Sequence, residues 1–225
     1  MRAQISVVVP TYNAEHALAG CLGALMEGIE QGLIRELIVS DGGSTDASGA
    51  VAQAWGAEVL SGPASRGGQL RRGVDGAKGD WVLIVHADTV LTAGWTDAAR
   101  VKLNNPEMAG WFMLAFDQRG IGATVVAGWA NLRSRLGLPY GDQGLLIHRD
   151  LYNAVGGYPD QPLMEDVALA RQLRGRLEMM DSVAVTSAAK YRKQGWIRRG
   201  AKNLLLLLRY FAGTSPEQLA RSYRR

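Results

Sequence analysis

Asp80-Trp81-Val82-Leu83-Ile84-Val85-His86-Ala87-Asp88-Thr89 is the stretch that decides the fold. Its apolar run, 81–85, is too short for an independent helix but suits a strand that is buried on both faces, as in a parallel sheet covered by helices. Sheets of this kind bind their ligands at the carboxyl ends of the strands. Residues two apart on an extended segment share a side, so His86 and Asp88 are expected to converge there. The alternative is a structural histidine followed by an aspartate that caps the next segment.

The chain before this strand repeats a pattern of strand, loop and helix. Strands are predicted at 5–10, 36–40 and 57–60, each followed by a turn and a helical pattern. Asn13 is predicted to cap the first helix, and Ser44 or Thr45 the second. Together with the strand that begins at Asp80, this order predicts an α/β fold with a mostly parallel sheet flanked by helices.

The second half of the chain is less regular. Helices are predicted over 94–104 and 124–136, and strands over 108–116 and 145–147. A turn over 139–144 places Asp142 and Gln143 in front of the last of these strands. Glu165 and Asp166 follow at a point where a loop enters a helix, and such a pair would also be explained as acidic partners of the helix dipole.

The turns lack the glycine-rich phosphate cradles of other nucleotide enzymes. No G-x-G-x-x-G follows the first strand and no G-x-x-x-x-G-K-[ST] occurs, which argues against a dinucleotide oxidoreductase and a P-loop enzyme. Thr11, Tyr12, Asp41 and Asp88 stand at the strand ends instead. The Asp41 carboxylate could accept a hydrogen bond from a base or a ribose hydroxyl, and the Tyr12 ring could stack on a base.

Composition and charge divide the chain unequally. We predict one folded domain over 1–190 and a basic helical tail over 191–225, because residues 190–225 carry ten Lys and Arg against one acid, Glu217. The single cysteine, Cys21, lies on an apolar helical face and fits a reducing compartment. Neither a signal peptide nor a spanning helix is predicted, so we expect a cytoplasmic protein, or one that rests peripherally on the cytoplasmic membrane face.

The tail combines cations with five consecutive leucines, 204–208. This combination favours contact of 196–211 with a membrane surface or a lipid-linked acceptor. The main alternative is a helix that packs its leucines on the domain or on a second subunit of a homodimer. Nucleic acid would explain the charge but not the leucines, so no nucleic-acid partner is expected. Lys190 and Arg192, nearest the domain, could instead pair with phosphate oxygens.

Five motifs, taken in order, resemble the family 2 glycosyltransferases of the GT-A fold over residues 4–190. The matching motifs are Val9-Pro10-Thr11-Tyr12-Asn13, Asp41-Gly42-Gly43-Ser44-Thr45-Asp46, residues 66–73, His86-Ala87-Asp88, and Glu165-Asp166 after a Gly-Gly-Tyr loop. The resemblance implies inverting transfer of a sugar from a nucleoside-diphosphate-sugar donor to a hydroxyl acceptor, with help from Mn²⁺ or Mg²⁺.

The resemblance also implies roles for individual residues. Asp88 would bind the metal, and Asp166 would be the catalytic base with Glu165 as its neighbour. The nucleotide and donor would be bound by Pro10, Thr11, Tyr12, Asp41, Arg66, Arg71 and His86, with Lys190 and Arg192 as further phosphate partners. Tyr140, Asp142 and Gln143 would lie on the acceptor side.

Two departures from the family pattern bear on these roles. His86 replaces the first acid of the D-x-D element, and Gly42 replaces the second acid of the D-D-G-S turn. Without a Q-x-x-R-W motif, a processive polysaccharide synthase is not expected. Two alternatives remain: a non-catalytic protein that binds a sugar nucleotide or lipid head group, and a sugar nucleotidyltransferase, which would be expected to carry a glycine-rich basic loop after the first strand.

Overall fold

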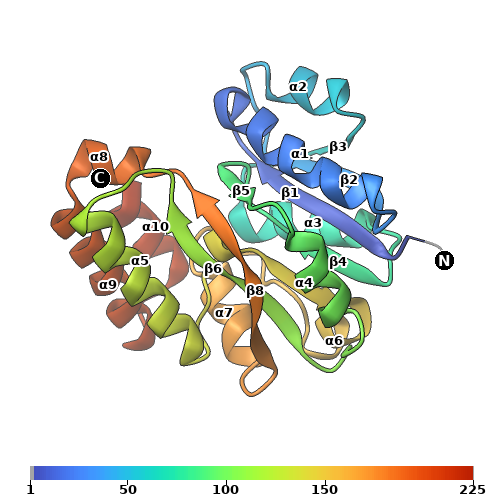
Figure 1. Ribbon diagram of the computed structural model, residues 1–225. Helices are drawn as coiled ribbons and strands as arrows, with labels where there is room; N and C mark the ends of the chain where they lie inside the picture. Colours follow the sequence, from blue (N-terminus) through green and yellow to red (C-terminus); the bar gives the residue numbers. More distant parts are fainter. Residues whose placement is uncertain (1–2, 225) are drawn as a thin grey trace.

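The computed structural model describes residues 3–224 as an α/β structure (Figure 1). The strands are β1 (Ile5–Thr11), β2 (Ile34–Asp41), β3 (Glu58–Ser61), β4 (Trp81–Ile84), β5 (Thr89–Leu91), β6 (Ala109–Phe116), β7 (Leu145–His148) and β8 (Leu177–Thr186). The helices are α1 (Glu15–Glu30), α2 (Ser48–Ala54), α3 (Arg66–Gly76), α4 (Trp95–Lys102), α5 (Ile121–Arg135), the short 3₁₀ helix η1 (Gly141–Gln143), α6 (Arg149–Ala154), α7 (Glu165–Gln172), α8 (Ala189–Gln194), α9 (Trp196–Phe211) and α10 (Pro216–Arg224).

The strands form one sheet in the order β3-β2-β1-β4-β7-β6-β8-β5. The pairs β2–β3, β1–β2, β1–β4 and β6–β8 are parallel, whereas β7 runs antiparallel to both of its neighbours and β5 antiparallel to β8. The predicted fold class, a mostly parallel sheet flanked by helices, is confirmed. Strands β5 and β8 and helix α6 are not among the elements predicted from the sequence.

Helices bury both faces of the sheet, which explains the unbroken apolar runs in the central strands. Along β4, Trp81 and Leu83 enter the core under α1, α2 and α4, and Val82 and Ile84 enter the opposite core under α3, α6 and α7. At about 25 cal/mol per Å² of apolar surface, burial on both faces makes this strand a main source of stability.

The carboxyl ends of the parallel strands bring the predicted polar residues to one edge of the sheet. β1 ends at Thr11, β2 at Asp41, and β4 at Ile84, so His86 and Asp88 lie in the loop that follows β4. This loop turns through a hydrogen bond from the Thr89 amide to the His86 carbonyl. Strand β4 ends one residue before the apolar run does, and His86 and Asp88 follow in the turn.

The prediction that Asn13 caps the first helix is wrong, because its side chain bonds to a different loop. Asn13 adopts a left-handed φ of 47°, and its side-chain oxygen accepts from the Thr45 amide, 32 residues away, at 2.9 Å. Helix α1 begins at Glu15, whose amide donates to Asp46, while the Glu15 carboxylate accepts from the Ala47 amide at 2.8 Å. The loops after β1 and β2 therefore cap one another's helices, an arrangement that local capping rules do not anticipate.

The C-terminal helices pack against the domain rather than extending from it (Figure 1). Leu206 and Leu207 of α9 and Leu219 of α10 form a third apolar cluster with Leu163 and Val167 at the start of α7. The alternative in which the tail packs its leucines on the domain is therefore confirmed for one face of α9. Within the described residues, no helix has the length and apolar character needed to cross a bilayer.

Candidate active site

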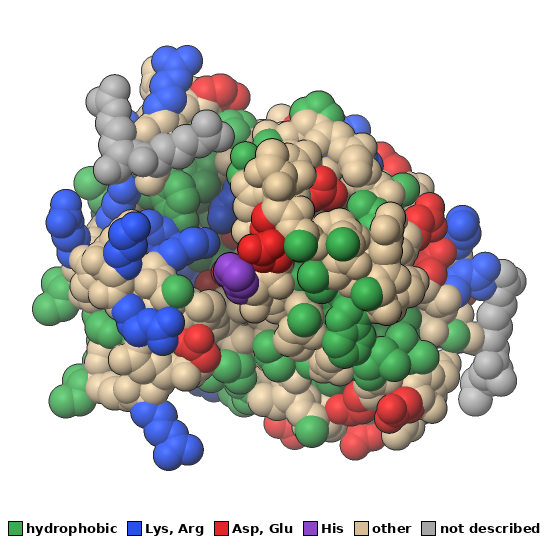
Figure 2. Space-filling view, turned by 90° about the horizontal axis from the view of Figure 1, so that it is seen from above, with side chains coloured by type: hydrophobic (Ala, Val, Ile, Leu, Met, Phe, Trp, Pro, Cys, Tyr) green, Lys and Arg blue, Asp and Glu red, His purple; other side chains and the backbone are tan. Residues whose placement is uncertain are grey.

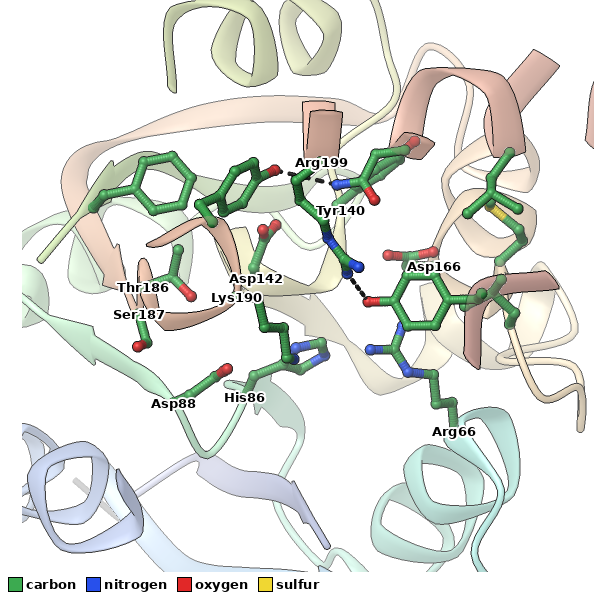
Figure 3. Close-up of a pocket in the computed structure, with 17 residues that line it drawn as sticks. Arg66, His86, Asp88, Tyr140, Asp142, Asp166, Thr186, Ser187, Lys190 and Arg199 are labelled. Atoms are coloured by element: carbon green, nitrogen blue, oxygen red, sulfur yellow. Dashed lines mark hydrogen bonds between the residues drawn. The ribbon is translucent and has the colours of Figure 1, made fainter. Parts of the chain in front are cut away.

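A cavity that opens to solvent lies between the sheet edge and helices α8–α10. Figure 2 shows the surface hollowed where the C-terminal helices meet the N-terminal half, with Lys and Arg gathered on the C-terminal side. The lining includes Asp88, Asp142 and Asp166 together with Arg66, Lys190 and Arg199 (Figure 3). Three carboxylates and three cations thus face one space, which suits a ligand that carries both phosphate and hydroxyl groups.

A second cavity, also open to solvent, continues along the ends of β1 and β4. Pro10 and Tyr12 line it, and the Tyr12 side chain is freely accessible there, as a residue that stacks on a ring must be. Four residues line both cavities: Arg66, His86, Asp88 and Lys190. The junction between the two cavities therefore carries two cations, one carboxylate and one imidazole.

His86 and Asp166 both lie against Gly141. The Gly141 amide donates to Asp166 Oδ2 at 2.9 Å, and a Cβ on Gly141 would collide with the His86 imidazole. Burial lowers the pKa of His86, with Asp88 acting in the opposite direction. The ring is therefore neutral near pH 7, the form in which imidazole ligates metals.

Glu165 and Asp166 begin α7 but point to different cavities. Asp166 lines the first cavity, with its carboxylate held by the amides of Gly141 and Val167. Glu165 lines the second cavity, is 1% exposed, and lies 3.9 Å from Arg66 Nη1. Burial raises the pKa of Glu165 to about 7, with a further contribution from Asp166, while Arg66 opposes the shift. Glu165 therefore supports Arg66, and Asp166 is free to meet a substrate.

Replacing Glu165 with Gln is expected to stabilise the protein at pH 8 by about 1–3 kcal/mol and to have little effect near pH 4.5. A carboxyl whose pKa is raised in the folded state contributes its stability below the unfolded pKa of 4.5 and loses it as the pH rises through about 7. Urea unfolding at both pH values measures the difference, with the exposed Glu30→Gln as the control. If Glu165→Gln changed the free energy of unfolding equally at pH 4.5 and pH 8, burial would not raise the pKa of Glu165.

The three predicted acceptor-side residues have different surroundings. Tyr140 and Asp142 line the first cavity, whereas Gln143 is 0% exposed. The Gln143 amide accepts from Ser134 and donates to the Phe112 carbonyl, so this side chain holds the turn and does not face the cavity. Burial raises the pKa of Asp142 to about 6, with Arg133 opposing the shift, and Asp142 Oδ1 has no hydrogen-bond partner among the described residues. Asp142 therefore has a free acceptor for a ligand hydroxyl.

Four other predicted donor residues do not line either cavity. The Asp41 carboxylate accepts from the Gly43 and Ser44 amides, both at 2.9 Å, and the buried Thr11 hydroxyl donates to the Val9 carbonyl. Arg71 and Arg192 are exposed on outer helix faces. Asp41 thus shapes its own turn in this structure, and the roles that the family resemblance implies for these residues stay predictions.

Gly42 has a structural explanation in Gln69. A Cβ on Gly42 would lie 2.8 Å from Gln69 Oε1, and Gln69 Nε2 donates to the carbonyls of Thr11 and Ser40. Gln69 therefore joins the ends of β1 and β2 through space that an aspartate at position 42 would need. Glycine at position 42, where the D-D-G-S pattern has an acid, therefore leaves room for the Gln69 side chain.

Sequence reasoning missed the contribution of the C-terminal helices to the cavity. Tyr191, Arg199, Asn203, Leu206 and Tyr223 all line it. A helical projection of α9 would have found some of them, because Arg199, Asn203 and Leu206 recur at the spacing of one helix face. The membrane interpretation of this segment drew attention to the leucines instead.

The donor set at the cavity junction fits a divalent cation that also has phosphate ligands. Within residues 3–224, no cluster of three His, Cys, Asp or Glu side chains could hold a metal unaided. Asp88 supplies one hard oxygen ligand and His86 a neutral nitrogen. Mg²⁺ commonly takes one or two carboxylates and completes its shell with substrate phosphates and water, and Mn²⁺ likewise favours carboxylate and water oxygens.

Comparisons with known proteins find glycosyltransferases, by sequence over part of the chain and by fold over most of it. A family model for glycosyl transferase family 2 matches residues 6–109. A mannosyltransferase from Pyrobaculum calidifontis, solved with GDP-Man and Mn²⁺, is 22% identical with a TM-score of 0.67, over 96% of this chain and 67% of that one. Glucosyl-3-phosphoglycerate synthase from Mycobacterium tuberculosis, solved with Mn²⁺ and UDP-Glc, is 21% identical with a TM-score of 0.58, over 82% and 70% of the two chains. TarS from S. aureus is 18% identical with a TM-score of 0.60, over 90% of this chain and 40% of its own length.

Among curated proteins, none gives a significant sequence match. The structural likenesses confirm the predicted GT-A-like fold.

Proposed function

We propose that the chain is a family 2 glycosyltransferase, which the match of that family's model over residues 6–109 supports, and that it moves a sugar from a nucleoside-diphosphate-sugar donor to a hydroxyl acceptor with inversion at the anomeric carbon. The observation that carries the proposal is the placement of Asp88 and Asp166 in one cavity, which shares Arg66 and Lys190 with a second cavity beside it. A nucleotidyltransferase is less well supported, because the loop after β1 is not a basic glycine-rich phosphate loop.

The donor is proposed to lie across both cavities. Its base and ribose would occupy the second cavity, where Tyr12 offers an accessible ring for stacking. Its diphosphate would lie at the junction, where the Arg66 guanidinium and the Lys190 ammonium pair with phosphate oxygens. The sugar would then point into the first cavity, toward Asp142 and Asp166.

Asp88, with His86 beside it, is proposed to hold Mn²⁺ or Mg²⁺. When bound there, the cation supplies charge stabilisation to the departing diphosphate. Arg66 and Lys190 add positive charge on the same group, and the neutral His86 ring contributes a ligand or a hydrogen bond without repelling the metal. The Mn²⁺ in two of the solved relatives supports this assignment.

Asp166 is proposed as the base that removes the acceptor proton. Its two amide partners orient the carboxylate without neutralising it, so it can accept a proton from a hydroxyl within hydrogen-bond distance. Attack from the Asp166 side, opposite the diphosphate at Asp88, is a direct displacement and inverts the anomeric carbon. Proton NMR of the first product formed would show the configuration, and retention would contradict this geometry.

The proposed donor class is tested by thermal shift with a panel of UDP, GDP and dTDP sugars, with and without Mn²⁺. A ligand that binds only the native state raises its stability, by about 2.7 kcal/mol at a hundred times its Kd. We expect at least one nucleotide sugar to raise the melting temperature, and the rise to depend on Mn²⁺. If no nucleotide sugar shifts the transition under any metal condition, the proposed function fails.

The helices α5 and α9 are also proposed to rest on an anionic membrane surface, which would favour a lipid-linked acceptor. The two helices lie side by side, with Gly122 against Trp196 and Gly200 against Val126. Apolar side chains are exposed along both, including Ile121 at 86% and Ile197 at 90%. Arg198 and Lys193 are exposed nearby, and residues 190–225 carry a net charge of +9. Apolar stripes bordered by cations are typical of interfacial helices.

Cosedimentation with vesicles that contain 30 mol% phosphatidylglycerol tests this surface. We expect binding that weakens at 0.5 M salt and falls about fivefold or more in the double variant Ile197→Ser, Leu205→Ser. The control is Val101→Ser, which removes a valine that is 75% exposed on α4. Equal binding by both variants would contradict the proposal, as would light scattering that shows a homodimer disrupted by the double variant.

A further inference from the structure

Arg199 is a buried cation without a carboxylate partner. Its residue is 5% exposed, and none of the ion pairs within residues 3–224 involves it. The guanidinium donates to Gln194 Oε1 at 3.1 Å and to the Tyr223 hydroxyl, and it lies 4.5 Å from the centre of the Tyr223 ring. Its Nε is buried and has no hydrogen-bond partner. A buried charge left unpaired is costly, so this arrangement needs a compensating anion.

Arg199 reaches into the first cavity. Figure 3 shows its guanidinium group directed into the space that Asp166 and Lys190 also line. Each of the other cations of this cavity already has a role: Arg66 is paired with Glu165, and Lys190 lies at the junction where the donor diphosphate is proposed. Arg199 lines the first cavity and not the second. It therefore lies on the acceptor side of the metal position, on the side of the proposed base.

We infer that Arg199 binds an oxyanion of the acceptor, with a phosphate group as the best match to its fork of donors. A guanidinium presents parallel N–H groups that fit two oxygens of one phosphate, and such charge-assisted bonds are roughly twice as strong as neutral ones. The inference rests on the proposed function and adds to it that the acceptor hydroxyl belongs to a phosphorylated molecule. A soluble phosphate ester and a lipid phosphate head group share this chemistry.

The test is a calorimetric titration of inorganic phosphate into the full chain, first alone and then saturated with UDP or GDP and Mg²⁺. The nucleotide occupies the junction, so the phosphate site that remains is expected to be the one at Arg199. We expect Arg199→Gln to weaken this remaining site at least about tenfold. The matched control is Arg198→Gln, the neighbouring exposed arginine of the same helix, which should leave phosphate affinity unchanged.

Two further variants keep the test decisive if Arg199→Gln does not fold. Arg199→Lys preserves the charge without the fork and should give intermediate affinity. Tyr223→Phe leaves Arg199 in place and removes the hydroxyl that occupies one of its N–H groups, so phosphate should bind about threefold more tightly. Unchanged phosphate affinity in the folded Arg199 variants, or in Tyr223→Phe, would overturn the inference. No phosphate binding to the nucleotide-saturated wild type would also overturn it.

Two arms separate the sources of the phosphate. Competition by glycerol 3-phosphate supports a soluble acceptor, and Arg199-dependent binding to phosphatidylcholine vesicles with 10 mol% phosphatidic acid supports a lipid acceptor. If the wild type did not bind nucleotide, the proposed function would be contradicted. The phosphate titration of the nucleotide-free protein would still decide the role of Arg199. An Arg66→Gln variant should show the opposite pattern, with weaker nucleotide binding and an intact Arg199 site.

Discussion

Asp166→Asn is expected to lower kcat by about 10²–10⁴-fold while the protein stays folded and binds its donor normally. The amide occupies the same volume and can keep the hydrogen bond from Gly141, but it cannot take a proton from the acceptor. The nucleotide part of the donor is proposed to occupy the second cavity and the junction, which Asp166 does not line, so the affinity for the nucleotide part should change little. The measurement is nucleoside diphosphate release under saturating donor, together with the donor Kd from thermal shift.

Asp181→Asn, at an exposed position of β8, is the control for this substitution. A kcat for Asp166→Asn within a few-fold of the wild type would remove Asp166 from the role of base. Asp142, whose Oδ1 has no partner and whose pKa is raised to about 6 by burial, would then be the next candidate.

Asp88→Ala is expected to abolish metal-dependent turnover, with a loss of at least about a thousandfold. Among residues 3–224, Asp88 is the only carboxylate that lines both cavities. Its side chain can be removed without disturbing the loop, because the Ser187 amide donates to the Asp88 backbone carbonyl. The Mn²⁺-dependent part of the donor thermal shift should disappear in the same variant.

The exposed Asp75→Ala on α3 serves as its control. If the Asp88→Ala protein retained Mn²⁺-dependent donor binding, the metal site would lie elsewhere. His86→Ala is then informative by comparison, since a smaller loss than that of Asp88→Ala fits a secondary ligand or a contact to the sugar.

Much of the sheet could be predicted because its strands carry the signal themselves. The run Trp81–Ile84 is apolar on both faces since both faces are covered, and the strands near the N-terminus share this property. The polar residues that end these strands then follow from parallel topology, which places all their carboxyl ends together. His86 and Asp88 were found in this way.

Long-range partners explain what could not be predicted. Strand β8 has no unbroken apolar run, because Glu178, Asp181 and Ser182 interrupt it, and it pairs with β6 and β5, neither of which is close to it in sequence. Asn13 follows the local rule for a helix cap, but its side chain bonds to Thr45, and Asp41 is satisfied within its own turn. Arg199 lies in a basic, leucine-rich segment, and only the packing of α9 and α10 reveals that it is buried beside the cavity.

The most direct test of the account measures transfer itself. The wild type, Asp88→Ala and Asp166→Asn are each incubated with the nucleotide sugar that gives the largest thermal shift, Mn²⁺ and a set of phosphorylated and neutral hydroxyl acceptors, and both nucleoside diphosphate and glycosylated product are quantified. The account predicts equal amounts of the two products from the wild type and almost none from either variant. Pyrophosphate release, or donor binding by the wild type without any turnover, would contradict it.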